Sequence, residues 1–276
     1  MDLYAQKVSF DVSFVIINRI KIIINKTTIM KQKLKSFTGA LFLFIMLFPA
    51  VSIAQTKNLI STNRVFPKMD KIAEFEKALA NHAQKYHTGD ATWRVFAIQS
   101  GPDAGGYHIT EGPTSWAGED ARGDLGAEHQ NDWNKNVAVY LTDRQSASYS
   151  LYVDSLSTIA MGDYSDKINI THVYPKIGHG DNVVNMIKRL KKAWVSLGIT
   201  VAVYSVTSSG PAQYAVVTRY KQGLKEREPG FRKPFREAYD AVNGEGAYAQ
   251  YLKDAAEYIN ESWSELLFFQ KNLSSK

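Results

Sequence analysis

A tetrapeptide that occurs twice constrains the fold of this chain more than any other feature of its sequence. Residues 65–68 read VFPK, and residues 173–176 read VYPK. The same features follow each copy in the same order: an amphipathic helical pattern, an aromatic-rich strand, the tripeptide SGP, and a strand that begins with tyrosine. Self-similarity at a fixed period indicates a repeated unit, so the sequence predicts one unit of roughly 105 residues that is present twice.

The hydrophobic pattern predicts the elements of both units. Apolar residues at spacings of three and four indicate helices, and short aromatic and aliphatic runs between turn residues indicate strands. The first unit has predicted strands at 63–66, 92–99, 107–111 and 150–155, with helical stripes at 70–86 and 125–140. The second unit has predicted strands at 170–174, 200–206, 214–219 and 266–270, with helical regions at 181–197 and 230–259. Each unit therefore has the order β-α-β-β-α-β, which is the ferredoxin-like order of a four-stranded antiparallel sheet with both helices on one face.

The uncovered face of each sheet predicts how the two units pack. This face carries four aromatic residues, Phe66, Phe96, Tyr174 and Tyr204. A surface of this kind is too apolar to remain in water, and pressing the two sheets together buries it. We therefore expect an α+β fold in which two ferredoxin-like βαββαβ repeats, residues 55–158 and 159–276, pack sheet to sheet as an intrachain α/β barrel.

Residues 30–54 have the three parts of a secretory signal peptide. Lysines precede an apolar stretch at 40–48, and small residues lead up to Ala54. A helix over that apolar stretch would measure ~14 Å, well short of a ~30 Å hydrocarbon core, so a transmembrane anchor is not favoured. Residues 1–29 precede this complete signal and are expected to be an over-extended start outside the fold. We expect a periplasmic or secreted protein without a stable membrane anchor after the signal is cleaved.

The charge and cysteine content exclude several classes of protein. The chain has 33 basic and 27 acidic residues, and residues 1–54 hold seven of the basic and two of the acidic ones. The remaining 26 basic and 25 acidic residues make the mature part nearly neutral, which gives no electrostatic reason for nucleic-acid binding. The chain has no cysteine, so it has no disulfide and cannot be a lipoprotein.

The order of elements and the duplication resemble those of the dimeric α/β-barrel superfamily. That group includes antibiotic-biosynthesis-type monooxygenases, haem-degrading enzymes, chlorite-dismutase-like haem proteins and stress-responsive barrels. The tandem copies look like an internal version of the usual homodimer, and the chain is also similar to exported proteins of Bacteroidetes-like bacteria. The resemblance covers nearly all of the mature chain and implies a central cavity between the sheets. It also implies haem as a cofactor of some members, whereas no motif in this sequence predicts a cofactor.

Seven residues are candidates for a ligand site in that cavity: Arg64, Arg94, Phe96, His108, His172, Tyr174 and Tyr204. Alternate residues of a strand face opposite sides of a sheet. The intervening valines are expected to pack on the helices, which sends the polar and aromatic set inward. Apolar walls with a few polar groups are typical of a small-molecule site, and Arg94 is expected to orient an acidic or carbonyl-bearing ligand with His172 beside it. The alternative is that the polar side chains lie at strand ends in water, and the pattern does not decide which way His108 points.

No motif in the sequence predicts a particular reaction. There is no H-E-x-x-H, no carboxylate cluster with ligand spacing, no G-x-S-x-G, and no glycine-rich phosphate loop between a strand and a helix. Of the six histidines, His82 and His87 lie at a spacing of five on a predicted helix and do not share a helical face. We therefore expect no metal site.

Three functions stay open at this point. The first is an exported barrel that binds a small apolar or aromatic molecule between its sheets. The alternatives are a monooxygenase-type or haem-using enzyme, as the resemblance implies, and a structural or interaction protein whose barrel is filled by its own side chains. The sequence does not decide whether a reaction is catalysed. A small-molecule ligand and self-association are the expected partners.

Overall fold

The computed structural model describes residues 56–276 of the chain. The signal peptide predicted at residues 30–54 and the over-extended start predicted at residues 1–29 lie outside the described residues. Within 56–276, no helix combines the length and the apolar character that a membrane crossing requires.

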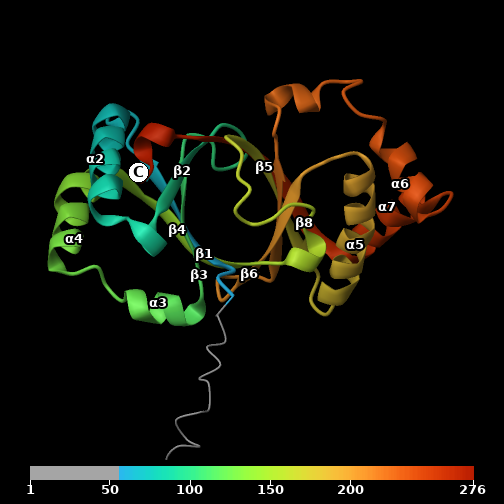
Figure 1. Cartoon of the computed structure of the whole chain (residues 1–276), viewed down its shortest axis with the longest axis horizontal. Helices are drawn as coiled ribbons and strands as arrows, with labels where there is room; N and C mark the ends of the chain where they lie inside the picture. Colours follow the sequence, from blue (N-terminus) through green and yellow to red (C-terminus); the bar gives the residue numbers. More distant parts are fainter. Residues whose placement is uncertain (1–55) are drawn as a thin grey trace, which may run out of the picture. The chain divides into compact units, whose positions relative to one another are not determined.

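The strands close into one antiparallel barrel, which Figure 1 shows between two groups of helices. The strands are β1 (Leu59–Pro67), β2 (Trp93–Ile98), β3 (Tyr107–Thr114), β4 (Leu141–Tyr152), β5 (Lys167–Pro175), β6 (Val201–Thr207), β7 (Gln213–Arg219) and β8 (Ile259–Phe269). Around the barrel they follow the order β1-β3-β2-β8-β5-β7-β6-β4, and every neighbouring pair is antiparallel. Closure pairs both edges of the sheet, which removes the exposed edges on which open sheets aggregate.

The helices lie outside the barrel on two sides (Figure 1). They are α2 (Ile72–Tyr86), α3 (Trp116–Arg122), α4 (Ala127–Asp132), α5 (Gly180–Ser196), α6 (Phe235–Asn243) and α7 (Ala247–Tyr258). Short 3-10 turns lie at Gly89–Ala91, Ala138–Tyr140, Asp154–Leu156, Gly223–Arg227 and Lys271–Leu273, and a π-helical turn spans Trp133–Val137. One group, α2 to α4, is drawn beside the strands of the first half of the chain, and α5 to α7 beside those of the second.

The two long helices pack their apolar faces on outward-facing valines of the barrel. Phe75 and Leu79 of α2 lie in one buried cluster with Val65 and Val95. The cluster beneath α5 contains Val183, Ile187, Val173 and Val203. Burial of each such side chain contributes about 1.5–3 kcal/mol. The prediction that these valines face the helices is confirmed, so period two directs the residues between them into the barrel.

Each half of the chain ends in a segment that packs on the other half. After β4, Leu156 is buried in the cluster beneath α5, and Ser157 accepts a backbone hydrogen bond from β6 at 2.9 Å. After β8 the reverse occurs: Leu273 is buried in the cluster beneath α2, and Ser274 accepts a backbone hydrogen bond from β2 at 3.0 Å. The C-terminal turn is accordingly drawn next to α2 in Figure 1.

The α+β class and the barrel are confirmed, but the structure corrects three details of the prediction. The prediction had two separate sheets packed face to face, whereas the edges of the two sheets are hydrogen-bonded, with β2 paired to β8 and β4 paired to β6. The helical stripe at 125–140 is broken at Asp132 into a short helix, a π-helical turn and a 3-10 turn. β4 begins at Leu141 instead of residue 150, and β8 begins at Ile259 instead of residue 266. The early parts of both strands are mostly exposed and contain few apolar residues, so they lack the regular alternation that marks a half-buried strand.

Candidate functional site

Two cavities lie inside the barrel, and the seven candidate residues line them. The first, termed the arginine cavity, has a volume of about 80 Å³, and the second, termed the His172 cavity, about 260 Å³. Arg94, Phe96 and Tyr204 line the arginine cavity, Arg64, His172 and Tyr174 line the His172 cavity, and His108 lines both. The structure therefore places all seven on the cavities of the barrel interior, although Arg94 and Tyr174 lie next to the ends of their strands and are half-buried. Their binding of a ligand stays a prediction.

Arg94, on β2, holds its guanidinium among aromatic rings of the arginine cavity. Its Cζ lies 4.0 Å from the ring centre of Tyr164, which belongs to the loop between β4 and β5, and 4.3 Å from that of Phe269. A cation over an aromatic face gains roughly 0.5–2 kcal/mol. These rings do not accept hydrogen bonds from the guanidinium N–H groups as strongly as a carboxylate would. The buried Nε of Arg94 has no hydrogen-bond partner among the described residues.

Arg219, the last residue of β7, brings a second guanidinium to the same cavity. Its Nη1 donates to the backbone oxygens of Ala160 at 3.1 Å and Asp163 at 2.6 Å, and its Nη2 donates to the Tyr204 hydroxyl at 2.9 Å. All three acceptors are neutral. Burial lowers the pKa of Arg94, and the charge of Arg219 lowers it further, but a guanidinium stays protonated in proteins. The arginine cavity thus carries two positive charges. The sequence analysis missed Arg219, although it shares a strand face with Ala215 and Val217.

The polar residues around the His172 cavity satisfy one another. Glu265, on β8, is fully buried and accepts hydrogen bonds from Arg64 Nη1 at 3.0 Å and from His172 Nε2 at 2.8 Å. Arg64 Nη1 also donates to Asp103 Oδ2 at 2.6 Å. The amide nitrogen of Gln213 donates to Nδ1 of His172, so both ring nitrogens are engaged in a pattern that fits one neutral tautomer.

This network fixes the charge of two groups at the centre of the barrel. Burial opposes the ionisation of Glu265, but the hydrogen bonds from His172 and Arg64 outweigh it and lower the pKa of Glu265 to about 2. Burial, reinforced by the charge of Arg64, lowers the pKa of His108 to about 3. At neutral pH Glu265 is therefore ionised and His108 is neutral. The Nδ1 of His108 has no hydrogen-bond partner among the described residues.

Haem, which the fold resemblance implies for some members, does not fit the barrel interior. Neither ring nitrogen of His172 is free to bind iron, because Glu265 and Gln213 occupy them. His108 lies between cavities of about 80 and 260 Å³, and an engineered cavity of roughly 150 Å³ holds only one benzene. A macrocycle of four pyrrole rings needs far more room than either cavity offers.

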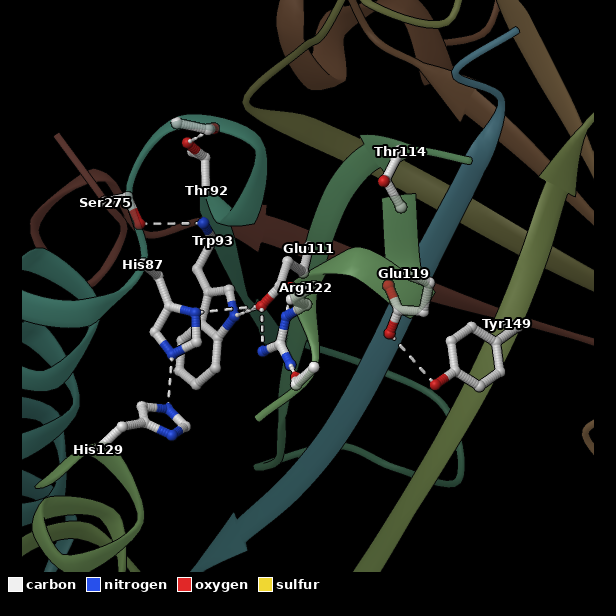
Figure 2. Close-up of polar contacts among 12 residues, drawn as sticks. His87, Thr92, Trp93, Glu111, Thr114, Glu119, Arg122, His129, Tyr149 and Ser275 are labelled. Carbon is white, nitrogen blue, oxygen red and sulfur yellow. Dashed lines mark hydrogen bonds and ion pairs between the residues drawn. The ribbon is translucent and has the colours of Figure 1, made fainter. Parts of the chain in front are cut away.

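A further cluster of polar residues lies outside the barrel, where the sequence predicted no site. His82 on α2, His87 just after α2 and His129 on α4 bring their Nε2 atoms together, at 3.2 Å between His82 and His129 and 3.3 Å between His129 and His87. Figure 2 shows the contact between His87 and His129. The spacing of five is misleading because α2 ends at Tyr86, so helical periodicity does not set the direction of the His87 side chain. A histidine at a helix end together with the H-x-x-D at residues 129–132 is the signal that sequence reasoning passed over.

Comparison with solved structures shows the fold of the chain. A proposed monooxygenase of Fusobacterium nucleatum is similar with a TM-score of 0.50 and 12% identity, over 77% of this chain and 92% of that one. A proposed chlorite dismutase matches at 0.47 and 8% identity, over 78% and 96% of the two chains, and an anthrone oxidase-like protein at 0.47 and 13%, over 78% and 92%. The chain therefore shares the α+β barrel fold of the first of these structures.

No family model matches the sequence, and no curated protein is a significant match. Because the structural matches share so little sequence, they establish the fold alone, and the function has to be argued from the geometry of the sites.

Proposed function

We propose that the barrel binds a small acidic molecule, with the acidic group on Arg94 and Arg219 and an apolar or aromatic part against the cavity wall. The observation that carries this proposal is a pair of guanidinium groups on one cavity, buried at Arg219 and half-buried at Arg94, neither of which is bonded to a carboxylate in residues 56–276. A buried charge without a partner costs several kcal/mol, and an anion is the ligand that removes this cost. Asp166 attracts Arg94 at a distance but makes no hydrogen bond to it, which leaves its donors available.

The size and walls of the cavity limit the ligand. The volume of about 80 Å³ accommodates a short-chain carboxylate. The two cavities share five lining residues, among them His108 and Ile170, so an aromatic acid held at Arg94 would extend past His108 toward His172. Phe96 supplies an apolar wall beside that path.

The charged states inside the barrel favour binding over acid–base catalysis. A general base works best when its pKa lies near the operating pH. The pKa of His108, at about 3, and that of Glu265, at about 2, are both far below neutrality. His108 is therefore suited to exchange a hydrogen bond with a ligand, whereas a monooxygenase-type activity has no base of suitable pKa in these two residues.

Export and duplication complete the proposal. The apolar stretch and small residues of 30–54 support a signal peptide, which would take the barrel to the periplasm or outside the cell. The barrel order places β4-β1-β3-β2 next to β8-β5-β7-β6, so corresponding strands follow the same order in both halves. That order is the one expected if two ferredoxin-like repeats replaced the two subunits of a dimer.

The test measures binding of acetate, propionate and benzoate, and of benzyl alcohol as a neutral analogue, by titration calorimetry. We expect the acids to bind and Arg94→Ala to weaken their binding at least about tenfold, which corresponds to one lost charge-assisted hydrogen bond of ~1.5–3 kcal/mol. Arg227→Ala is the matched control, because Arg227 is an exposed arginine whose hydrogen bonds are with Tyr220 and Asn169, outside both cavities. Equal affinities for acids and the alcohol, or equal losses in both variants, would contradict the proposal.

A further inference from the structure

Three histidine side chains outside the barrel converge on one point. The Nε2 separations of 3.2 Å and 3.3 Å share the His129 atom, and the candidate ligand atoms of His82, His87 and His129 all lie within 4.8 Å of one another. Two nitrogens bound tetrahedrally to one zinc ion at 2.0–2.1 Å lie ~3.3 Å apart. The two short separations therefore match the spacing that a shared metal ion imposes.

Carboxylates fix the tautomers of two of these histidines. Nδ1 of His82 lies 2.7 Å from Asp132 Oδ2, and Nδ1 of His87 lies 3.1 Å from Glu111 Oε2. An ionised carboxylate only accepts hydrogen bonds, so each Nδ1 carries the proton and each Nε2 presents a lone pair to the common point. His129 can donate one Nε2 proton to one of these lone pairs, which leaves the other without a donor. A single cation satisfies all three nitrogens.

A second layer of hydrogen bonds holds the two carboxylates in place. Glu111, on β3, accepts from the indole Nε1 of Trp93 at 2.7 Å and from Arg122 Nη2 at 3.1 Å (Figure 2). Burial opposes the ionisation of Glu111, but the hydrogen bonds from His87, Arg122 and Trp93 outweigh it and lower its pKa. Asp132 accepts from Asn136 Nδ2 at 2.8 Å. Carboxylates that orient ligating histidines in this way are typical of metal centres.

The cluster is closed on one side and open on the other. His82 and His87 are buried, whereas His129 is half-buried on α4. His87 and His129 line a pocket of about 560 Å³ that also has Arg122 and Gln130 on its wall. Structural zinc sites use four protein ligands, whereas three ligands with one open position are typical of sites at which zinc binds water or a substrate.

We propose that His82, His87 and His129 bind one zinc ion through their Nε2 atoms and leave a fourth position that faces the pocket beside Arg122. Three imidazoles suit zinc and other late first-row divalent metals, and the expected fourth ligand in the free protein is water. This site is separate from the barrel interior, and its test does not depend on acid binding there.

The experiment titrates Co²⁺ into chelator-treated protein that carries no histidine tag, and then displaces it with Zn²⁺. We expect one equivalent of Co²⁺ with the visible bands of tetrahedral coordination, loss of those bands on adding Zn²⁺, and a higher Tm with Zn²⁺ than with chelator. His129→Ala should abolish the bands while circular dichroism shows an intact fold. His179→Ala is the matched control, because His179 stacks on Tyr258 on the α5 side of the molecule.

The two carboxylates provide a finer test. Asp132→Asn and Glu111→Gln should weaken Zn²⁺ binding by roughly 10- to 100-fold without changing its stoichiometry, as expected for residues that orient ligands. Asp132 is the safer of the two because it is less buried than Glu111, so it keeps the test valid if Glu111→Gln fails to fold. The proposal is overturned if the wild type binds no Co²⁺, binds it without tetrahedral bands, or binds it as well as His129→Ala does.

Discussion

The two cavities inside the barrel hold similar residues in opposite states. In the His172 cavity, Arg64 is paired with Glu265 and Asp103, and the network satisfies its own charges and hydrogen bonds. In the arginine cavity, Arg94 is held by aromatic rings and lies near Arg219 without a bonded carboxylate. The difference indicates that the first network stabilises the barrel, whereas the second leaves positive charge available for a ligand.

The largest expected effect comes from breaking the paired network. Glu265→Gln leaves the buried Arg64 with only Asp103 as a carboxylate partner, and we expect a loss of about 3–5 kcal/mol in the free energy of unfolding. The measurement is urea unfolding followed by circular dichroism. Glu261→Gln on the exposed part of the same strand is the matched control and should stay within about 0.5 kcal/mol of wild type. Equal effects of both variants would remove the distinction between the cavities.

Acid should act on the same network in two steps. The pKa of His108 is lowered in the folded state to about 3, so the unfolded chain binds its proton first, and stability falls as pH drops below ~6.5. The pKa of Glu265 is lowered to about 2, so its contribution is present above ~4.3 and is lost as pH falls from there through about 2.

Urea unfolding at several pH values between 7 and 3 measures these slopes. His82, His87 and His129 also have lowered pKa values, so the part due to His108 is the difference between wild type and His108→Gln. We expect that variant to have a smaller slope between pH 6.5 and 4.5. An unchanged slope would show that His108 is not held neutral by the fold.

An intermediate effect is expected at the boundary of the arginine cavity. Tyr204→Phe removes the acceptor of the buried Arg219 Nη2 and should cost about 1–3 kcal/mol. Tyr220→Phe removes the same kind of hydrogen bond, from Arg227 at 2.8 Å, in an exposed position, and should cost much less because water replaces the hydroxyl. Thermal unfolding of the pair checks this contrast, and similar losses would mean that Arg219 is hydrated in the folded state.

The smallest change in stability is expected at Arg94 itself. Arg94→Met replaces an unpaired cation with an apolar side chain of similar length, and we expect the free energy of unfolding to stay the same or to rise by ~1 kcal/mol. Differential scanning calorimetry in buffer without carboxylates tests this. A loss of more than about 2 kcal/mol in the free energy of unfolding would show that the aromatic contacts of Arg94 stabilise the fold. Arg94 would then stabilise the barrel as Arg64 does, and the two cavities would no longer differ in this respect.

The barrel and the residues that line it could be predicted from the sequence, because successive side chains of a strand point to opposite faces of the sheet. The alternation of Val65, Val95, Val173 and Val203 with polar and aromatic neighbours is sufficient to direct six of the seven candidates inward, whereas the direction of His108 could not be predicted. Tyr164 could not be predicted because it approaches Arg94 from a loop. The pairing of Arg64 with Glu265 was also out of reach, because it joins residues 201 positions apart across a strand register that the sequence does not specify.

The histidine cluster was missed for a different reason. Helical periodicity assigns a direction to each residue only as long as the helix continues, and α2 ends one residue before His87. His129 and Asp132 come from a short helix more than forty residues further along the chain, in a stretch whose apolar stripe is irregular. Periodicity predicts the direction of side chains only within a regular helix or strand, so it does not detect a site whose residues lie where these elements end.

The exchange of segments after β4 and β8 has a consequence for how the protein is assembled. Leu156 from the first half completes the core beneath α5, and Leu273 from the second half completes the core beneath α2. Neither half therefore has a complete hydrophobic core of its own. Two fragments produced by cleavage of the loop between the halves would stay associated through these exchanged segments. Synthesis from the N-terminus leaves the core beneath α2 without Leu273 until the segment after β8 has been added. Native packing of the first half must then wait until the second half has been synthesised.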